Sequence, residues 1–179
     1  ILYEMERYNE AVKAFDKGLA IDMEDVRMLN KKKEALKPLE RYEEIISVSD
    51  RILEKNPADA STLYDKGVAL QKLEDYRQAI EQFEEALSYN PRDVYALEHE
   101  KHIYKEMELW EKVIRTTDRI TEIEPDNFEA WYDKGDAYLK TENPSKALES
   151  FNQALKIKGS DIDSFEGKKE ALLELERYD

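Results

Sequence analysis

The sequence has 179 residues, enough for one domain with a sizeable core, and 39% of them are charged while only five are Gly and five are Pro. This composition favours a water-soluble helical protein over a sheet-rich fold. The 28 basic and 42 acidic residues give a net charge of −14, a field that repels phosphate backbones and anionic lipid surfaces, so we expect neither nucleic acid nor a membrane as a partner.

Missing residue types and missing segments narrow the class further. The chain has no cysteine, which excludes disulfides, cysteine-bound zinc and thiol catalysis. No stretch approaches the ~20 apolar residues of a membrane-spanning helix, and no signal peptide pattern is found, so a cytoplasmic location is the default expectation. The opening residues Ile1 to Met5 are typical of the middle of an amphipathic helix, and we expect that an upstream part of the protein is missing.

Apolar residues recur at helical spacing from one end of the sequence to the other. Leu63 and Gly67 mark the buried face of one helix, and Ala79 and Phe83 mark that of the next. The same spacing predicts a short helical remnant before Tyr8 and then ten helices, with boundaries good to ~2–4 residues. In chain order, these helices lie near residues 9–22, 27–39, 43–55, 61–73, 77–89, 95–107, 111–123, 129–141, 144–157 and 163–176.

Capping residues mark several of these boundaries. Asp75 and Asn143 are predicted N-caps, and Pro91 is predicted to end the helix before it. Gly159 takes the place of that proline after a later helix, as a C-terminal glycine. Pro38 should bend or shorten the helix predicted for residues 27–39, because its ring would clash with a carbonyl one turn earlier.

The sequence is built of tandem repeats of equal length, each spanning about 34 residues. The stretches 60–93 and 128–161 are identical at thirteen of 34 places, and 26–59 and 94–127 at twelve, whereas the adjacent stretches 60–93 and 94–127 match at only four. We infer a super-repeat of two consecutive repeats, in which two unit types alternate. The predicted organisation is a single array over residues 1–179, made of a partial repeat 1–25, the repeats 26–59, 60–93, 94–127 and 128–161, and a partial repeat 162–179 that supplies a first helix only.

Seven positions in the stretches 60–93 and 128–161 carry the pattern of a known family. They resemble, in register, the tetratricopeptide repeat, a helix-turn-helix unit of the same length: Trp131, Gly135, Tyr138, Ala147, Phe151, Ala154 and the terminal Pro91. The resemblance covers essentially the whole chain without an insertion. It implies an all-α fold, a right-handed superhelical α-solenoid of antiparallel helix pairs, in which each repeat buries its face against its neighbours.

The two unit types differ in a coordinated way. Where the glycine units (60–93 and 128–161) have Gly on the first helix and Phe on the second, the lysine units (26–59 and 94–127) have Lys and then Ser or Thr. Large and small residues have exchanged places, which cores tolerate when the total volume is kept. We therefore expect the lysine units to fold, with each lysine stem along apolar surface and each ammonium group in water.

No residue pattern indicates catalysis, a cofactor or a metal. The two histidines, His99 and His102, lie near Glu98 and Glu106, but they lack the spacing of a helical zinc signature, so a solvated helix face is the preferred interpretation. No phosphate-binding glycine loop or nucleophile elbow occurs. We expect no catalytic, cofactor-binding or metal-binding residues, and a protein that is not an enzyme.

The resemblance places one face of the first helices on a concave groove and implies a scaffold that binds a partner peptide or helix there. The acidic charge favours a basic or amphipathic partner. We expect Tyr64 and Tyr132 to be surface residues whose replacement by Ala leaves the melting temperature nearly unchanged. The candidate partner-binding residues are Tyr64, Val68, Gln71, Tyr95, Glu98, His102, Lys105, Tyr132, Asp136 and Leu139.

Two alternatives stay open at the level of the sequence. The array could be a regulatory or substrate-recruiting region of a larger enzyme, or it could be a self-associating structural array. Apolar residues of the two terminal partial repeats, such as Phe15 and Phe165, are predicted to be open, and burying them favours head-to-tail association of copies.

Overall fold

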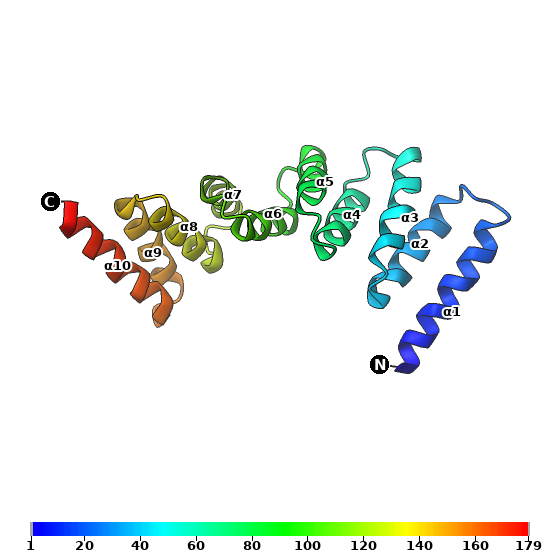
Figure 1. The fold of residues 1–179 in the computed structure, drawn as a ribbon, viewed down its shortest axis with the longest axis horizontal. Coiled ribbons are helices and arrows are strands. Elements are labelled where there is room, and N and C mark those ends of the chain that lie inside the picture. Colours follow the sequence, from blue (N-terminus) through cyan, green and yellow to red (C-terminus); the bar gives the residue numbers. More distant parts are fainter. Residues whose placement is uncertain (1, 179) are drawn as a thin grey trace. The chain divides into compact units, whose positions relative to one another are not determined.

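The computed structural model describes residues 2–178, with side chains from residue 4 to residue 176. Within this range every regular element is helical, and consecutive helices pack against each other within residues 1–91 and within residues 92–179 (Figure 1). The predicted all-α fold of antiparallel helix pairs is confirmed. The elements are α1 Leu2–Leu19, α2 Val26–Leu36, the short 3-10 helix η1 Lys37–Leu39, α3 Tyr42–Lys55, α4 Ala60–Lys72, α5 Tyr76–Tyr89, α6 Val94–Glu106, α7 Trp110–Ile123, α8 Phe128–Lys140, α9 Pro144–Ile157 and α10 Ile162–Tyr178.

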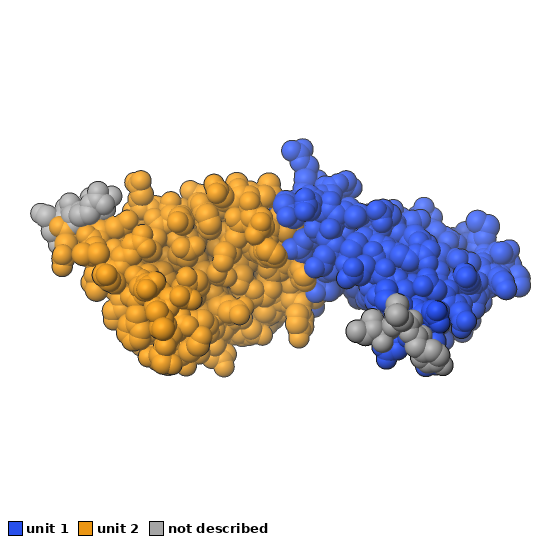
Figure 2. All heavy atoms as spheres, turned by 60° about the horizontal axis from the view of Figure 1, so that its bottom comes forward, with its two compact units in different colours: residues 1–91 blue, residues 92–179 orange. Residues whose placement is uncertain are grey.

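The helices fall into two compact units, residues 1–91 and residues 92–179 (Figure 2). Unit 1 contains α1 to α5 and unit 2 contains α6 to α10. In each unit, a helix packs on the next one along the chain, so the contacts are local in sequence. Such packing is what a repeat protein needs, because each helix pair buries its apolar face only against its neighbours.

Predicted caps hold the helix boundaries. Asp75 and Asn143 accept hydrogen bonds from backbone N–H groups in the first turns of α5 and α9, at 3.2 and 3.5 Å. Pro38 shortens the second helix as predicted, since α2 stops at Leu36 and the chain continues as η1. The predictions for the two caps and for the proline are confirmed.

The start of the chain differs from the prediction. The prediction of a helical remnant before Tyr8, followed by a separate helix over residues 9–22, is wrong, because α1 is one continuous helix from Leu2 to Leu19. Glu6 lies one repeat before Glu40, which reverses the chain in the next unit, yet Glu6 is helical. Glu6 and its neighbours Met5 and Arg7 are good helix formers, which favours one continuous helix here.

In the glycine units, a phenylalanine ring of the second helix packs directly against the first helix. A Cβ atom on Gly67 would lie 2.7 Å from the ring of Phe83, and one on Gly135 would lie 2.8 Å from the ring of Phe151. Both rings are almost fully buried. The glycines are therefore required for the close approach of the paired helices.

In the lysine units, the ammonium groups are buried, which corrects the prediction that they lie in water. Lys33 is 2% exposed and Lys101 is 5% exposed. The Nζ atom of Lys33 lies 2.8 Å from Oδ2 of Asp65, and that of Lys101 lies 2.8 Å from Oδ2 of Asp133. A buried ammonium group needs such a partner, because its desolvation is otherwise uncompensated.

Each turn within a helix pair places a glutamate in the left-handed region. Glu40, Glu74, Glu108 and Glu142 have φ angles of 54°, 61°, 55° and 54°, and among the described residues no glycine has a positive φ. Gly159 follows the C-cap residue Lys158 of α9, as predicted for a C-terminal glycine, but its φ is not positive. A side chain with a Cβ atom is strained in this region, since it crowds the backbone.

We expect Glu74→Gly to raise the free energy of unfolding by about 0.5 kcal/mol or more, because glycine relieves this strain and the gain exceeds its larger unfolded-state entropy. Urea unfolding monitored by circular dichroism measures the change. The control is Glu81→Gly at an exposed position inside α5, which should lower stability by about 1 kcal/mol. Equal losses for the two variants would contradict the expectation.

Candidate functional site

The predicted partner-binding residues divide between the two units. Tyr64, Val68 and Gln71 lie on α4 in unit 1, and the other seven lie on α6 and α8 in unit 2. We therefore describe two faces, one for each unit. The first-helix face of unit 2 comprises Tyr95, Glu98, His102, Lys105, Tyr132, Asp136 and Leu139.

In unit 1, Tyr64 is both a surface residue and a support of the core. Its ring centroid lies 5.8 Å from that of Phe83, and the two rings are tilted by 57°. Tyr64, Val68 and Gln71 are each half-buried on α4. Contacts of this kind between aromatic rings stabilise the helix pair.

In unit 2, hydrogen bonds and ion pairs join α6 to α8. The carboxylate of Asp133 accepts from both Lys101 and Lys105, and the Asn127 amide that caps α8 donates to Glu98 at 3.5 Å. Burial alone would lower the pKa of Lys101, but its pairing with Asp133 and Glu98 outweighs burial and raises the pKa. The predicted residues on α6 and α8 are thus brought onto neighbouring helices.

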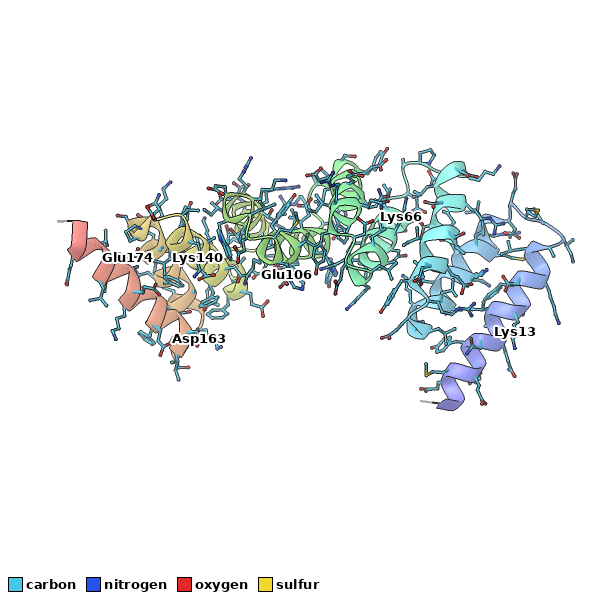
Figure 3. All side chains as sticks on the ribbon, in the orientation of Figure 1. Lys13, Lys66, Glu106, Lys140, Asp163 and Glu174 are labelled. Atoms are coloured by element: carbon cyan, nitrogen blue, oxygen red, sulfur yellow. The ribbon has the colours of Figure 1, made fainter. Side chains whose placement is uncertain are left out.

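Tyr132 sits in the most acidic part of this face. Burial raises the pKa of the Tyr132 hydroxyl, and so do the carboxylates of Asp136, Asp163, Asp133 and Asp161. Figure 3 shows the Asp163 side chain extending from the first turn of α10, so α10 contributes to the same surface. The structure thus brings carboxylates of α8 and α10 to one aromatic side chain.

The aromatic and apolar members of the face differ in how deeply they lie. The Tyr132 ring lies 6.4 Å from Phe128 and 5.8 Å from Phe151, centroid to centroid, and Leu139 packs against the core cluster around Phe151. Replacing Tyr64 or Tyr132 by Ala removes ring contacts with the core, so from the structure we expect the melting temperature to fall rather than to stay unchanged. Tyr95, by contrast, is 77% exposed and contributes little to the core.

Sequence reasoning missed a four-residue segment that occurs once in each glycine unit. Tyr-Asp-Lys-Gly is the longest identical run between residues 60–93 and 128–161, and each of its residues has a separate contact. In unit 2 the tyrosine contacts Phe151, the aspartate binds Lys101, and the glycine admits the Phe151 ring. The lysine, Lys134, pairs with Asp118 of α7 at 2.6 Å.

A hollow between α1 and α2 was also missed. It has a volume of about 460 Å³ and is lined by Ala14, Phe15, Gly18 and Met28 together with the charged residues Asp25, Arg27 and Lys31. The signal in the sequence was weak, since these residues come from two helices that the repeat pattern assigns to different repeats, 1–25 and 26–59. Over the described residues, we find no cluster of three or more His, Asp or Glu side chains arranged to hold a metal ion.

None of the helices in the described part of the chain combines the length and the apolar character that crossing a membrane requires. Their exposed faces carry charged side chains throughout, such as Lys13, Glu106 and Lys140 (Figure 3). Apolar side chains instead gather between paired helices. This distribution is typical of amphipathic helices that pack side by side in water.

Comparison with known proteins finds a matching sequence family and solved structures of similar fold. The sequence model of the tetratricopeptide repeat matches residues 60–93 and 128–161, which are the two glycine units. No curated protein matches the sequence. The structure of YrrB, a tetratricopeptide-repeat protein with an unusual peptide-binding site, has a TM-score of 0.77 and 23% identity, and the match covers 94% of this chain and 87% of YrrB.

Two further structures of similar fold are those of MamA. One has a TM-score of 0.77 and 21% identity, with 85% of this chain and 89% of that chain covered. MamA from Desulfovibrio magneticus RS-1 has a TM-score of 0.72 and 22% identity, with coverage of 87% and 88%. Residues 60–93 and 128–161 each match the model of the tetratricopeptide repeat, and the chain has the fold of tetratricopeptide-repeat proteins, built of tandem helix pairs over the described residues.

Proposed function

We propose that this protein is a non-catalytic scaffold that binds a peptide or helix of a partner protein on its first helices. The observation that carries the proposal is the first-helix face of unit 2, where an exposed Tyr95 accompanies a half-buried Tyr132. Exposed aromatic residues are typical anchors of protein interfaces. YrrB, a protein of similar fold, has a peptide-binding site, which supports a peptide as the ligand.

The partner segment is basic or amphipathic. Five carboxylates on α8 and α10 occupy the same repeat positions as the residues of this face. They have no ion-pair partner among the described residues: Glu129, Asp136, Asp163, Glu166 and Glu170. The lysine at its edge, Lys105, is already neutralised by Asp133. Unpaired acidic groups beside aromatic rings attract segments that carry Lys or Arg next to apolar residues.

We expect Tyr95→Ala to weaken partner binding by about tenfold or more while leaving the melting temperature unchanged, because the ring is exposed in the free protein and buried in the complex. A peptide selected from a displayed random library supplies the ligand, and fluorescence anisotropy measures its affinity. The peptides selected should be rich in Lys or Arg, and raising the salt concentration should weaken their binding, since charges are screened over ~8–10 Å at physiological ionic strength.

Tyr89→Ala is the matched control, since Tyr89 is 49% exposed but lies at the end of α5, a second helix. This variant should bind the selected peptide like the wild type. Asp163→Asn tests the charge and should weaken binding less at high salt than at low salt. Selection of acidic peptides, or loss of binding in Tyr89→Ala with no loss in Tyr95→Ala, would contradict the proposed function.

A further inference from the structure

A hollow of about 410 Å³ lies among α3, α4 and α5 of unit 1. Its lining includes the apolar side chains of Leu53, Pro57 and Leu63 and the exposed carboxylates of Glu54 and Glu85. Other helices of the chain precede α3 and follow α5, so the hollow is not the face of a terminal helix.

The residues around this hollow occur again in unit 2, two repeats later. On α4, Lys66 (Figure 3) pairs with Asp50 of α3 at 2.8 Å, and Lys134 of α8 pairs with Asp118 of α7 at 2.6 Å. Pro57 corresponds to Pro125 in the same way. The first helices differ at one position that lines the hollow, where unit 1 has Leu63 and unit 2 has Trp131.

In unit 2, the indole ring of Trp131 makes two contacts with these equivalent residues. Its Nε1 atom donates to the carbonyl oxygen of Pro125 at 2.8 Å, and the Nζ atom of Lys134 lies 4.6 Å from the ring centroid. The second contact is a cation–π interaction. Leu63 has neither a donor nor a ring, so it makes neither contact with Pro57 and Lys66 in unit 1.

We propose that the hollow of unit 1 is a docking site for a tryptophan side chain of a partner protein, flanked in the partner's sequence by Lys or Arg. The indole takes the place that Trp131 takes in unit 2, with its N–H group donated to the carbonyl of Pro57 and its ring against the ammonium group of Lys66. Tryptophan is among the residues that contribute most to binding at protein interfaces.

The charge of the hollow favours basic residues beside this tryptophan. Lys66 is neutralised by Asp50, whereas Glu54 and Glu85 have no ion-pair partner among the described residues. Lys or Arg next to the tryptophan complements these two carboxylates, which a free indole compound would leave unpaired. The residues that line the hollow are not among the candidate partner-binding residues, so this inference does not rest on the proposed function.

The probe is the capped tripeptide Lys-Trp-Lys with a fluorinated indole, and fluorine NMR measures its binding to the full chain. We expect saturable binding at one site, with shifts of the backbone amide signals of residues 53–66. A peptide with Leu in place of Trp should not bind. A peptide with an N-methylated indole, which cannot donate to Pro57, should bind about fivefold more weakly.

Two protein variants exchange the arrangements of the two units. Trp131→Leu should open a second site in unit 2, so that two peptides bind each chain, and this gain cannot arise from unfolding. Leu63→Trp with Leu53→Thr copies the residues of unit 2 and should weaken binding by about tenfold or more, because the protein's own indole then fills the hollow. Glu54→Gln with Glu85→Gln should weaken binding more at low salt than at high salt.

Four results would each overturn the proposal. Lys-Trp-Lys could fail to bind the wild-type protein, the number of sites could stay the same in Trp131→Leu, or binding could persist unchanged in Leu63→Trp with Leu53→Thr. In the fourth, N-acetyltryptophanamide binds as tightly as Lys-Trp-Lys, and the occupant is then a free indole compound.

Discussion

Asp65→Asn is expected to lower the free energy of unfolding by about 3 kcal/mol, because it leaves the buried ammonium group of Lys33 without a charged partner. Lys33 is 2% exposed, and its other hydrogen bond goes to the hydroxyl of Thr62 at 2.8 Å. In the variant, neither the amide at position 65 nor the Thr62 hydroxyl carries a charge that would neutralise the ammonium group. In a chain of this size, the melting temperature should fall by roughly 6–12 °C.

Asp133→Asn is the matched comparison in unit 2 and should cost less. Lys101 keeps a second carboxylate, that of Glu98, at 2.5 Å, whereas Lys33 has no second ion pair among the described residues. Lys33→Met with Asp65→Asn removes both charges and should recover most of the loss, because an apolar side chain suits the buried site. Urea unfolding of the four proteins tests this order, and equal effects of Asp65→Asn and Asp133→Asn would refute it.

Gly135→Lys is expected to be the most damaging single change, with a loss of more than about 4 kcal/mol. A Cβ atom at this position already lies 2.8 Å from the Phe151 ring, and the added ammonium group would be buried without a partner. Circular dichroism and melting curves should show a partly unfolded unit 2.

Two compensating changes should rescue this variant. Phe151→Thr clears the space, and Gly167→Asp places a carboxylate at the column of Asp133, so the triple variant copies the arrangement of Lys101, Thr117 and Asp133. A Cβ atom on Gly167 would meet the Phe151 ring at 2.4 Å, so Gly167→Asp alone should destabilise the protein. If the triple variant is no more stable than Gly135→Lys, the residues at these three repeat positions do not explain the difference between glycine units and lysine units.

Local sequence patterns predicted the helices because their start and stop signals are themselves local. Asp75 and Asn143 cap helices through bonds to residues three positions on, and Pro38 ends a helix through its own ring. The glutamate turns escaped prediction for the opposite reason. Glu74 has a high helix propensity and takes a left-handed conformation only because packing of α4 on α5 forces the reversal.

The buried lysines could not be predicted from their own helices. The partner of Lys33 is Asp65, which lies beyond α3 on the first helix of the next repeat, and nothing within α2 shows that a carboxylate will face it. The burial of a side chain is equally hard to predict from its position in the repeat. Tyr95 and Tyr132 belong to the same predicted face, yet Tyr95 is 77% exposed while Tyr132 rests on Phe151.

The pairing of Lys33 with Asp65 and of Lys101 with Asp133 also limits how a gene for such a protein can grow or shrink. Deleting one repeat, the stretch 60–93, would join the first lysine unit to the second and bring His99 to the column of Asp65, so Lys33 would lose its carboxylate. Deleting or duplicating two consecutive repeats keeps every lysine opposite an aspartate. Length variants of this array that remain stable should therefore differ by even numbers of repeats.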